Sequence, residues 1–229
     1  MGRNLASSQV EAQHVQAMGP ELGPVFHALW CEVASIHLRW QEYVELFGTK
    51  PSRLETLNKT APLFFHIVQN SLLESILIHL ARLTDPPESR GKKNLTIKSL
   101  PLLITDPPAA NKVEKLIAVA STKAVFCRDW RNRRIAHKDF FLALKQGAKP
   151  LQRATDQKMT EALDAIAQVM NEVESFYLNS RSIFERIPIS DGAVALLCLM
   201  RDALLFDKER RERCRKGEWR PDDYPNEEL

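Results

Sequence analysis

The segment RDWRNRRIAHKD, residues 128–139, holds the side chains of this chain that are best suited to chemistry. Its twelve positions contain five cationic side chains, one tryptophan and one histidine, although the formal charge of the whole chain is only +3. Arginine and lysine bind anionic groups, and histidine gains or loses a proton close to neutral pH. Residues of these types could hold an anion and cut it.

A structural interpretation of the same segment competes with this one. Phe126 and Trp130 would form the buried side of a helix, and the cations would lie on its solvated side, where a helix C-terminus favours positive charge. The order of the residues favours a site instead. Arg131 is followed by the polar Asn132, and five residues separate Arg131 from His137.

Helices must position this segment, because apolar residues recur at helical spacing along most of the chain and no alternating pattern indicates a strand. The sequence therefore predicts an all-α fold, a helical bundle of at least four long helices with short additional helices. The expected long helices are 23–47, 61–84, 107–139 and 156–184. The basic segment would then close the third of them.

Shorter helices are expected between and after the long ones. Ser52 and Glu55 fit a capping box that opens a short helix, and Thr96 fits the N-cap of a helix near 96–104. A last helix should begin at about residue 191 and run into a tail of mixed charge.

The two ends of the chain are expected to differ from its centre. Neither end offers enough apolar surface to offset the entropy lost on ordering. We therefore expect a flexible N-terminal segment at 1–20, a helical domain at 21–207 and a charged C-terminal extension at 208–229.

Composition excludes several classes of protein. Lys and Arg number 32 against 29 Asp and Glu, which is too small an excess for a histone-like nucleic-acid binder. The four cysteines form no CxxC pair, so we expect no metal site, no disulfide framework and a reducing, cytoplasmic location. No motif for a cofactor is present, and no apolar run is long enough to suggest a membrane protein.

Two stretches resemble a known family. WRNRRIAHKD at 130–139, and FFHIVQNSLLESILIHLARLTDP at 64–86 followed by NLTIKSL, are similar to the HEPN superfamily and most similar to its AbiU-like abortive-infection branch. The resemblance covers about residues 20–205. It implies a helical bundle that commonly dimerises, places two arginine–histidine motifs at the interface and, in active members, cleaves RNA without a metal.

RNA cleavage gives each residue of the motif a role. RNA carries its own nucleophile, the 2′-hydroxyl, so the protein must supply a base, an acid and positive charge. His137 would act as base or acid, Arg131 would stabilise the phosphate, and Asn132 would orient either the phosphate or the arginine. Four further cations are expected to bind RNA phosphates: Arg128, Arg133, Arg134 and Lys138.

The spacing of Arg131 and His137 leaves two arrangements open. Six positions of a straight helix turn the chain by about 600° and advance it by about 9 Å, so the two side chains would lie roughly 120° apart. Either the helix is distorted before His137, or a second chain completes the site. Arg133 and Arg134 share the face of His137 on a regular helix, so each is an alternative partner.

Other charged and histidine residues are weaker candidates. Four histidines on the first two long helices, at positions 27, 37, 66 and 79, have no carboxylate or cysteine at metal-ligand spacing. Arg82 and Asp85 in RLTDP resemble a family hallmark, although a charge pair that ends a helix is the simpler interpretation.

Three functions follow from these patterns. The first is a metal-independent endoribonuclease, acting as a homodimer in phage defence or as the toxin of a toxin–antitoxin pair with a possible antitoxin partner. The second is a non-catalytic protein that binds RNA or nucleotides. The third is a helical protein-interaction module whose basic segment is only surface.

Overall fold

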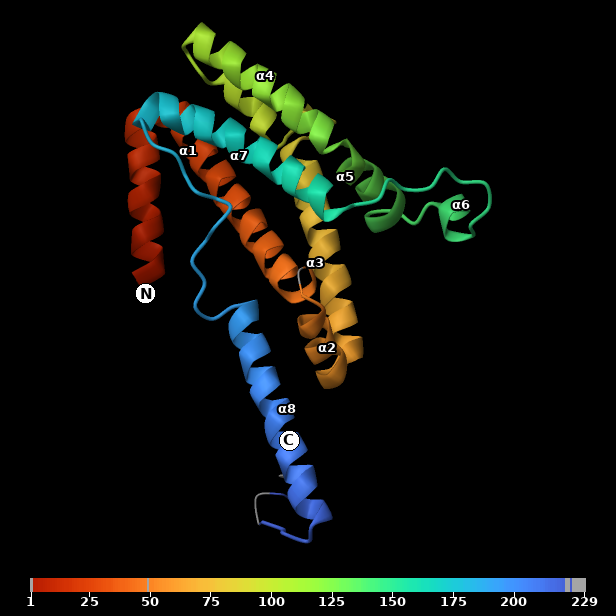
Figure 1. Cartoon of the computed structure of the whole chain (residues 1–229). Coiled ribbons are helices and arrows are strands. Elements are labelled where there is room, and N and C mark those ends of the chain that lie inside the picture. The colour runs from red at the N-terminus through yellow and green to blue at the C-terminus, as the bar shows by residue number, and fades with distance from the viewer. Residues whose placement is uncertain (1, 49, 221–222, 224–229) are drawn as a thin grey trace. The chain divides into compact units, whose positions relative to one another are not determined.

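The computed structural model describes residues 2–48, 50–220 and 223, with side chains from Ser8 onward. It is mostly helical, which confirms the predicted all-α helical bundle (Figure 1). In chain order the elements are α1 Gly2–Phe47, α2 Pro51–Thr60, α3 Pro62–Leu83, β1 Glu88–Ser89, β2 Lys92–Lys93, η1 Ile97–Leu102, α4 Pro107–Lys123, α5 Val125–Trp130, η2 Arg131–Ile135, α6 Phe140–Ala143, α7 Asp156–Leu178 and α8 Ala193–Arg215.

The chain divides into two compact units, and helices α1 and α3 contribute to both. The larger unit contains Met1–Gln41 and Ser71–Ile187, and the smaller contains Glu42–Asn70 and Pro188–Leu229. The basic segment lies in the larger unit.

Helix α1 begins well before residue 23, where the sequence predicted its start. The first twenty residues, expected to be flexible, are helical from Gly2, and the side chain of His14 is buried. Gly19 adopts a positive φ of 83°, which reverses the chain between two helical segments. A Cβ atom on Gly23 would lie 2.5 Å from the Cα atom of Val15, so glycine there lets the two segments pack closely.

The long helices match the predicted positions at several of their ends. Asp106 caps α4 by accepting a hydrogen bond from the Ala109 amide at 2.8 Å, and Thr155 caps α7 as expected. Helix α7 ends at Leu178 rather than near 184, because Asn179 takes a left-handed conformation that closes the helix.

The predicted capping box at the start of α2 is wrong. Pro51 occupies the first turn and Lys50 is the N-cap residue, with no side-chain hydrogen bond to the helix. Proline at this position has the φ that the helix needs and no N–H group that must be satisfied. The N-cap therefore falls two positions earlier than Ser52.

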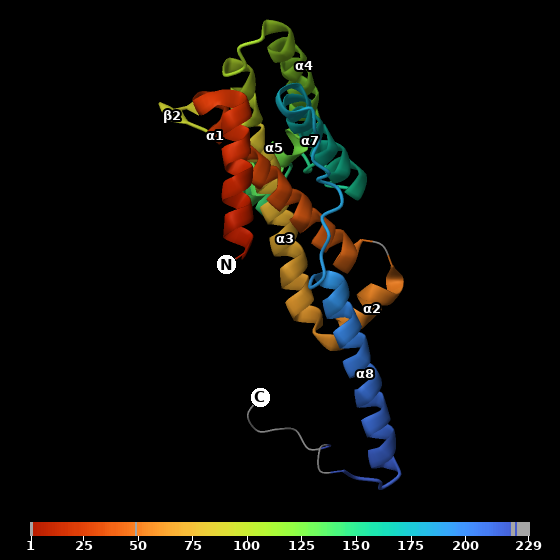
Figure 2. The same cartoon turned by 90° about the vertical axis from the view of Figure 1, so that its left-hand side faces the viewer.

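The core of the larger unit joins α1, α3, α4 and α7. Helices α4 and α7 lie side by side in both views (Figures 1 and 2). The fully buried side chains that α1, α3 and α7 contribute to this core include Phe26, Leu29, Ile36, Ile76, Leu77, Leu80, Met159 and Leu163.

A small turn after α3 was not predicted. Strands β1 and β2 pair antiparallel over two residues each, and the buried Thr96 fixes the chain that follows them. The Thr96 hydroxyl lies 2.8 Å from the Leu83 carbonyl and 2.9 Å from the Asp85 carbonyl. Thr96 also caps η1, as predicted, and it thereby holds Asp85 at the end of α3.

The smaller unit has its own apolar cluster. It packs Leu46, Leu57, Phe65, Ala193, Leu197 and Met200 together. The Glu42 carboxylate accepts a hydrogen bond from the Ala193 amide at 2.6 Å, so Glu42 satisfies a free N–H group at the start of α8.

Helix α3 is long and apolar enough to cross a membrane by length and composition alone. Its most apolar window is 22% buried within the protein. The core helix of a soluble protein passes the same test, so this is weak evidence, and the expectation of no membrane contact stays a prediction.

Candidate functional site

The basic segment lies where the third long helix loses its regular geometry. The predicted helix 107–139 is interrupted at Ala124, and α5 then continues into η2, a π-helical turn. In this turn the Ala136 amide donates to the Arg131 carbonyl, five residues back, at 2.8 Å. Such wide turns are rare in helices and occur frequently at functional sites. The helix is therefore distorted and ends before His137, while completion of the site by a second chain stays a prediction.

Asp85, at the end of α3, pairs with the motif arginine. Arg131 Nη1 donates to Asp85 Oδ2 at 2.5 Å, and their side chains are 23% and 20% exposed. Arg128 Nε lies 3.7 Å from Asp85 Oδ1, and Arg128 Nη2 donates to the Thr84 carbonyl at 3.0 Å. The carboxylate thus joins α3 to the start of the basic segment.

Sequence reasoning missed this role of Asp85. It assigned Asp85 to a charge pair with Arg82, but the ion pairs that the described residues form with Asp85 come from Arg128 and Arg131. The sequence did offer a signal, because RLTDP and RNRRIAH together carried the family resemblance. Asp85 and Arg131, which are 46 positions apart, could therefore have been expected to lie close together.

Asn132 orients the arginine. Its Oδ1 atom accepts a hydrogen bond from Arg131 Nε at 3.1 Å, so two edges of the guanidinium are held by two oxygens. This contact matches one of the two roles considered for Asn132. Within the described residues Arg131 Nη2 has no hydrogen-bond partner, which leaves it for an anion.

Lys98 is a second residue that the sequence did not single out. Burial lowers the pKa of its ammonium group, and the positive charge of Arg128 lowers it further, while Asp85 opposes both effects. Two arginines therefore pair with one carboxylate, and Lys98 is close enough for its charge to interact with Arg128 and Asp85. This local excess of positive charge is suited to an oxygen-rich anion.

Arg133 holds the loop that follows the motif. Its Nη2 donates to the Lys149 carbonyl at 2.6 Å, its Nη1 lies 3.4 Å from Asp129, and its Nε lies 3.9 Å from Asp139. These contacts give Arg133 a structural role and do not place its guanidinium at His137. The same loop is fixed by Trp130 Nε1, which donates to the Gln152 carbonyl at 2.7 Å.

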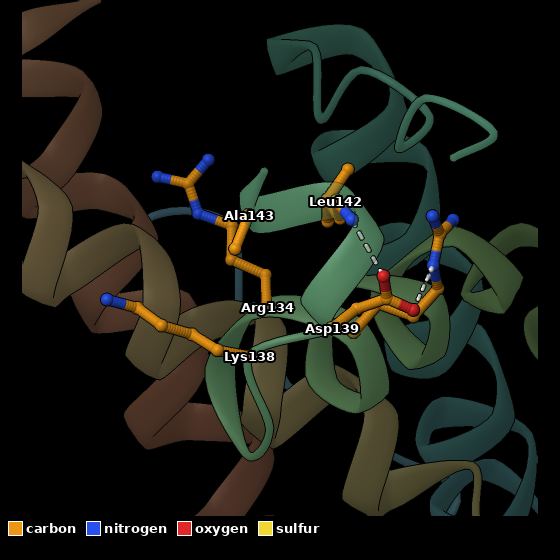
Figure 3. A pocket seen from close by; sticks show the side chains of 6 residues that line it. Arg134, Lys138, Asp139, Leu142 and Ala143 are labelled. Atoms are coloured by element: carbon orange, nitrogen blue, oxygen red, sulfur yellow. Dashed lines mark hydrogen bonds and ion pairs between the residues drawn. The ribbon is translucent and has the colours of Figure 1, made fainter. Parts of the chain in front are cut away.

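Arg134, His137 and Lys138 are exposed. The Arg134 guanidinium lies 5.0 Å from the centre of the Trp130 ring, a cation–π contact. Arg134 and Lys138 line a shallow pocket with Asp139, and they project to one side of it while Asp139 points to the other (Figure 3). The His137 ring has no hydrogen bond or ion pair with any residue that the structure describes, Arg131 included.

The histidines of α1 and α3 have structural surroundings, except for His66. His14 Nδ1 lies 3.2 Å from His27 Nδ1, and both rings are buried. Burial lowers the pKa of His14, of His37 and of His79, which keeps these rings neutral. His66 is exposed and contacts Asn70. No group of three or more histidine, cysteine, aspartate or glutamate side chains among the described residues is arranged to hold a metal ion.

A known family matches the part of the chain that contains this site. The chain matches the HEPN_AbiU2 family, described as AbiU2, over residues 19–191. This chain belongs to the AbiU2 family of the HEPN superfamily. The match includes both RLTDP and the arginine–histidine motif, and AbiU2 membership implies a role in abortive-infection phage defence. No curated protein and no solved structure matches the chain.

Proposed function

We propose that this AbiU2 protein is a metal-independent endoribonuclease, acting in phage defence or as the toxin of a toxin–antitoxin pair. The observation that carries the proposal is the fixed guanidinium of Arg131, held by Asp85 and Asn132 at a widened helical turn. His137 follows on an exposed segment and makes no competing contact with the described residues. A positioned cation and an accessible histidine are the groups that phosphodiester cleavage requires.

The reaction uses the 2′-hydroxyl of the RNA. A histidine removes the 2′-hydroxyl proton while the oxygen attacks phosphorus, and the bond from phosphorus to the 5′-oxygen breaks. The leaving oxygen receives a proton from an acid, so the products carry a 2′,3′-cyclic phosphate and a 5′-hydroxyl. Arg131 Nη2 stabilises the charge that develops on the phosphate oxygens.

A homodimer supplies the second proton-transfer group. One histidine cannot easily act as base and acid in the same step, whereas two copies of His137 in one cleft can divide the roles. Twofold symmetry provides this arrangement with a single interface. The copies of residues 131–137 would then lie near one another with RNA between them.

A second candidate function is RNA binding without cleavage. The ion pair between Arg131 and Asp85 favours it, because this carboxylate partly neutralises the cation that would otherwise stabilise the transition state. In that case the protein binds RNA with strong salt dependence but leaves it intact. A protein-interaction module would show neither property.

Incubation of the purified protein with total RNA in EDTA tests the proposal. We expect cleavage that EDTA does not reduce, and ends that are 2′,3′-cyclic phosphate and 5′-hydroxyl. His137→Ala should be inactive, while His66→Ala, which alters an exposed histidine outside the motif, should cleave normally. Chelator-sensitive cleavage that leaves 5′-phosphates would contradict this mechanism.

A further inference from the structure

Two phenylalanine rings are exposed three and four residues after His137. Phe140 and Phe141 are 66% and 58% exposed, although both belong to helix α6. Their ring centres lie 5.6 Å apart and their planes are nearly perpendicular, at 87°. Two adjacent phenylalanines with this much exposed surface need a partner, because apolar rings gain free energy when they leave water.

The start of helix α6, which carries these rings, is held in place by the Asp139 side chain. Asp139 caps α6 by accepting a hydrogen bond from the Leu142 amide at 2.8 Å, and Arg133 lies 3.9 Å from the same carboxylate (Figure 3). The exposed rings therefore extend from an anchored turn. A preorganised aromatic surface loses little entropy when it binds a partner.

Cationic side chains lie close to the rings along the chain, and two of them, Arg134 and Lys138, line a pocket with Leu142 and Ala143 of α6. Four exposed cations lie between residues 134 and 149, namely Arg134, Lys138, Lys145 and Lys149, and their side chains form no ion pair among the described residues. The carboxylate in this interval is Asp139, which Arg133 and the α6 cap already engage. The surface is thus both aromatic and cationic.

We propose that Phe140 and Phe141 stack on unpaired bases, so that the RNA bound at the arginine–histidine motif is single-stranded. This inference rests on the proposed function for the choice of RNA. Exposed bases offer flat faces to aromatic rings, and phosphates offer negative charge to the surrounding cations. A duplex offers the phosphates but keeps its base faces stacked inside.

Charge favours RNA over a second copy of this chain as the occupant. Direct docking of the α6 surface on its own copy, with no RNA between the two, would bring Arg134, Lys138 and the neighbouring lysines close to their equivalents. The same surface provides little negative charge to offset that repulsion. A single strand of RNA offers base faces to the rings and phosphates to the cations.

The position of the rings adds a geometric reason. Phe140 follows His137 by three residues, so their Cα atoms lie within about 11 Å of each other. Bases stacked on these rings would be close to the phosphate at the motif. Stacking would then hold the strand against the histidine.

Binding measurements with the full chain in the His137→Ala background, which prevents cleavage, test the inference. The probes are a labelled single-stranded oligoribonucleotide and the same strand annealed to its complement. Phe140→Ala and Phe141→Ala should each weaken single-strand binding by about fivefold or more, with duplex binding unchanged. Leu144→Ala, which removes exposed apolar surface but no ring, is the matched control and should bind normally.

Conservative substitutions separate stacking from apolar docking. Phe140→Leu keeps an apolar side chain without a ring and should weaken binding, whereas Phe140→Tyr should retain it. The loss should be the same factor at low and high salt, because stacking releases no counterions. Leucine variants that bind like wild type, or alanine variants that only dissociate a dimer in sedimentation, would overturn the inference.

Cleavage is measured separately with unsubstituted His137. If that protein cuts no RNA but its His137→Ala form shows the ring-dependent preference for single strands, the nuclease proposal fails and the stacking inference stands. If the protein cuts RNA but both probes bind equally to all the phenylalanine variants, the stacking inference fails and the nuclease proposal stands.

Discussion

The histidines of α1 and the histidine of the motif occupy opposite environments. His14, His27 and His37 are buried, with 4%, 8% and 5% of their surface exposed, and the first two contact each other. His137 lies beyond the end of η2, is exposed and has no fixed partner among the described residues. The buried rings contribute to packing and are kept from solvent, whereas His137 is accessible to a substrate.

The comparison shows that spacing along the chain does not decide which histidine is accessible to a substrate. His27 and Cys31 are four residues apart, a helical spacing, and their side chains do meet at 3.6 Å. Yet that contact lies beside a buried pair on a well-packed helix. The histidine that we propose for catalysis lies instead beyond a widened turn, where the helix has ended.

The largest expected effect, on the rate of RNA cleavage, comes from replacing the exposed histidine rather than a buried one. His137→Ala should reduce the rate of RNA cleavage by about 10²–10⁴, since a general acid–base catalyst is lost. His27→Ala should lower stability but leave the cleavage rate of the folded protein intact. Single-turnover cleavage, combined with a denaturation curve for each variant, measures both quantities. Activity that survives His137→Ala would remove the motif histidine from the mechanism.

The next largest effect should come from Asp85, a positioning residue. Asp85→Asn removes the charge that orients Arg131, and misplacement of a catalytic group by about 1 Å can cost up to about 10² in rate. We expect kcat to fall without a rise in KM, because a carboxylate that repels phosphate is lost at the same time. Asp129→Asn, whose partner is Arg133, is the matched control. Equal losses in the two variants would mean that Asp85 only supports the fold.

The sequence was sufficient to predict the helical class and the approximate places of the long helices. Apolar periodicity reports which face of a segment is buried, and a side chain suited to the N-cap position marked the start of the helix at Thr96. The fold class required only these local rules.

The sequence could not predict the irregular parts on which the site depends. Trp130 and Ala136, which flank the widened turn, have helical backbone angles, and the turn contains no proline or glycine, so no local signal marked it. The reversal at Gly19 was missed because residues 1–20 were expected to be flexible, so no helix was predicted before this glycine. The ion pair with Asp85 depends on two segments meeting in space, which only tertiary packing determines.

The pH dependence of stability gives a third test of the difference between the buried histidines and His137. Burial, and the adjacent His27, lower the pKa of His14, and burial lowers the pKa of His37. Above a pH of about 6.5 these rings are neutral in both folded and unfolded chains. As the pH falls below that value the unfolded chain binds protons first, so the free energy of unfolding should decrease, by at most about 1.4 kcal/mol per pH unit for each histidine.

Urea denaturation at pH values of about 7.5 and 5.5 measures this decrease. His37→Leu should make the decrease smaller, since it removes a ring whose Nε2 atom is buried without a hydrogen bond in the described part of the chain. His137→Ala should leave it unchanged. A decrease that depends on His137 as much as on His37 would contradict the difference in their environments.

A smaller effect on stability is expected within the motif. Arg133→Ala removes the hydrogen bond to the Lys149 carbonyl and two partly exposed ion pairs, which should cost about 1 kcal/mol of unfolding free energy. Hydrogen exchange in residues 144–153 should become faster. Arg134→Ala, whose side chain stacks on an exposed face of Trp130, should change neither quantity. Equal stability of the two variants would remove the structural role from Arg133.

The smallest expected effect concerns how strongly salt weakens RNA binding. Arg134 and Lys138 are exposed and form no ion pair among the described residues, so each is available to a phosphate. For a single strand, each phosphate contact that is lost should reduce the slope of log K against log salt by about 0.7. Arg134→Ala and Lys138→Ala should each produce this change, measured by titration at several salt concentrations in the His137→Ala background. Arg133→Ala should leave the slope nearly unchanged, because its guanidinium already contacts Asp129 and a backbone carbonyl. If Arg133→Ala lowers the slope as much as Arg134→Ala does, the two arginines contribute equally to phosphate binding and the division of the motif into a structural and an RNA-facing side is wrong.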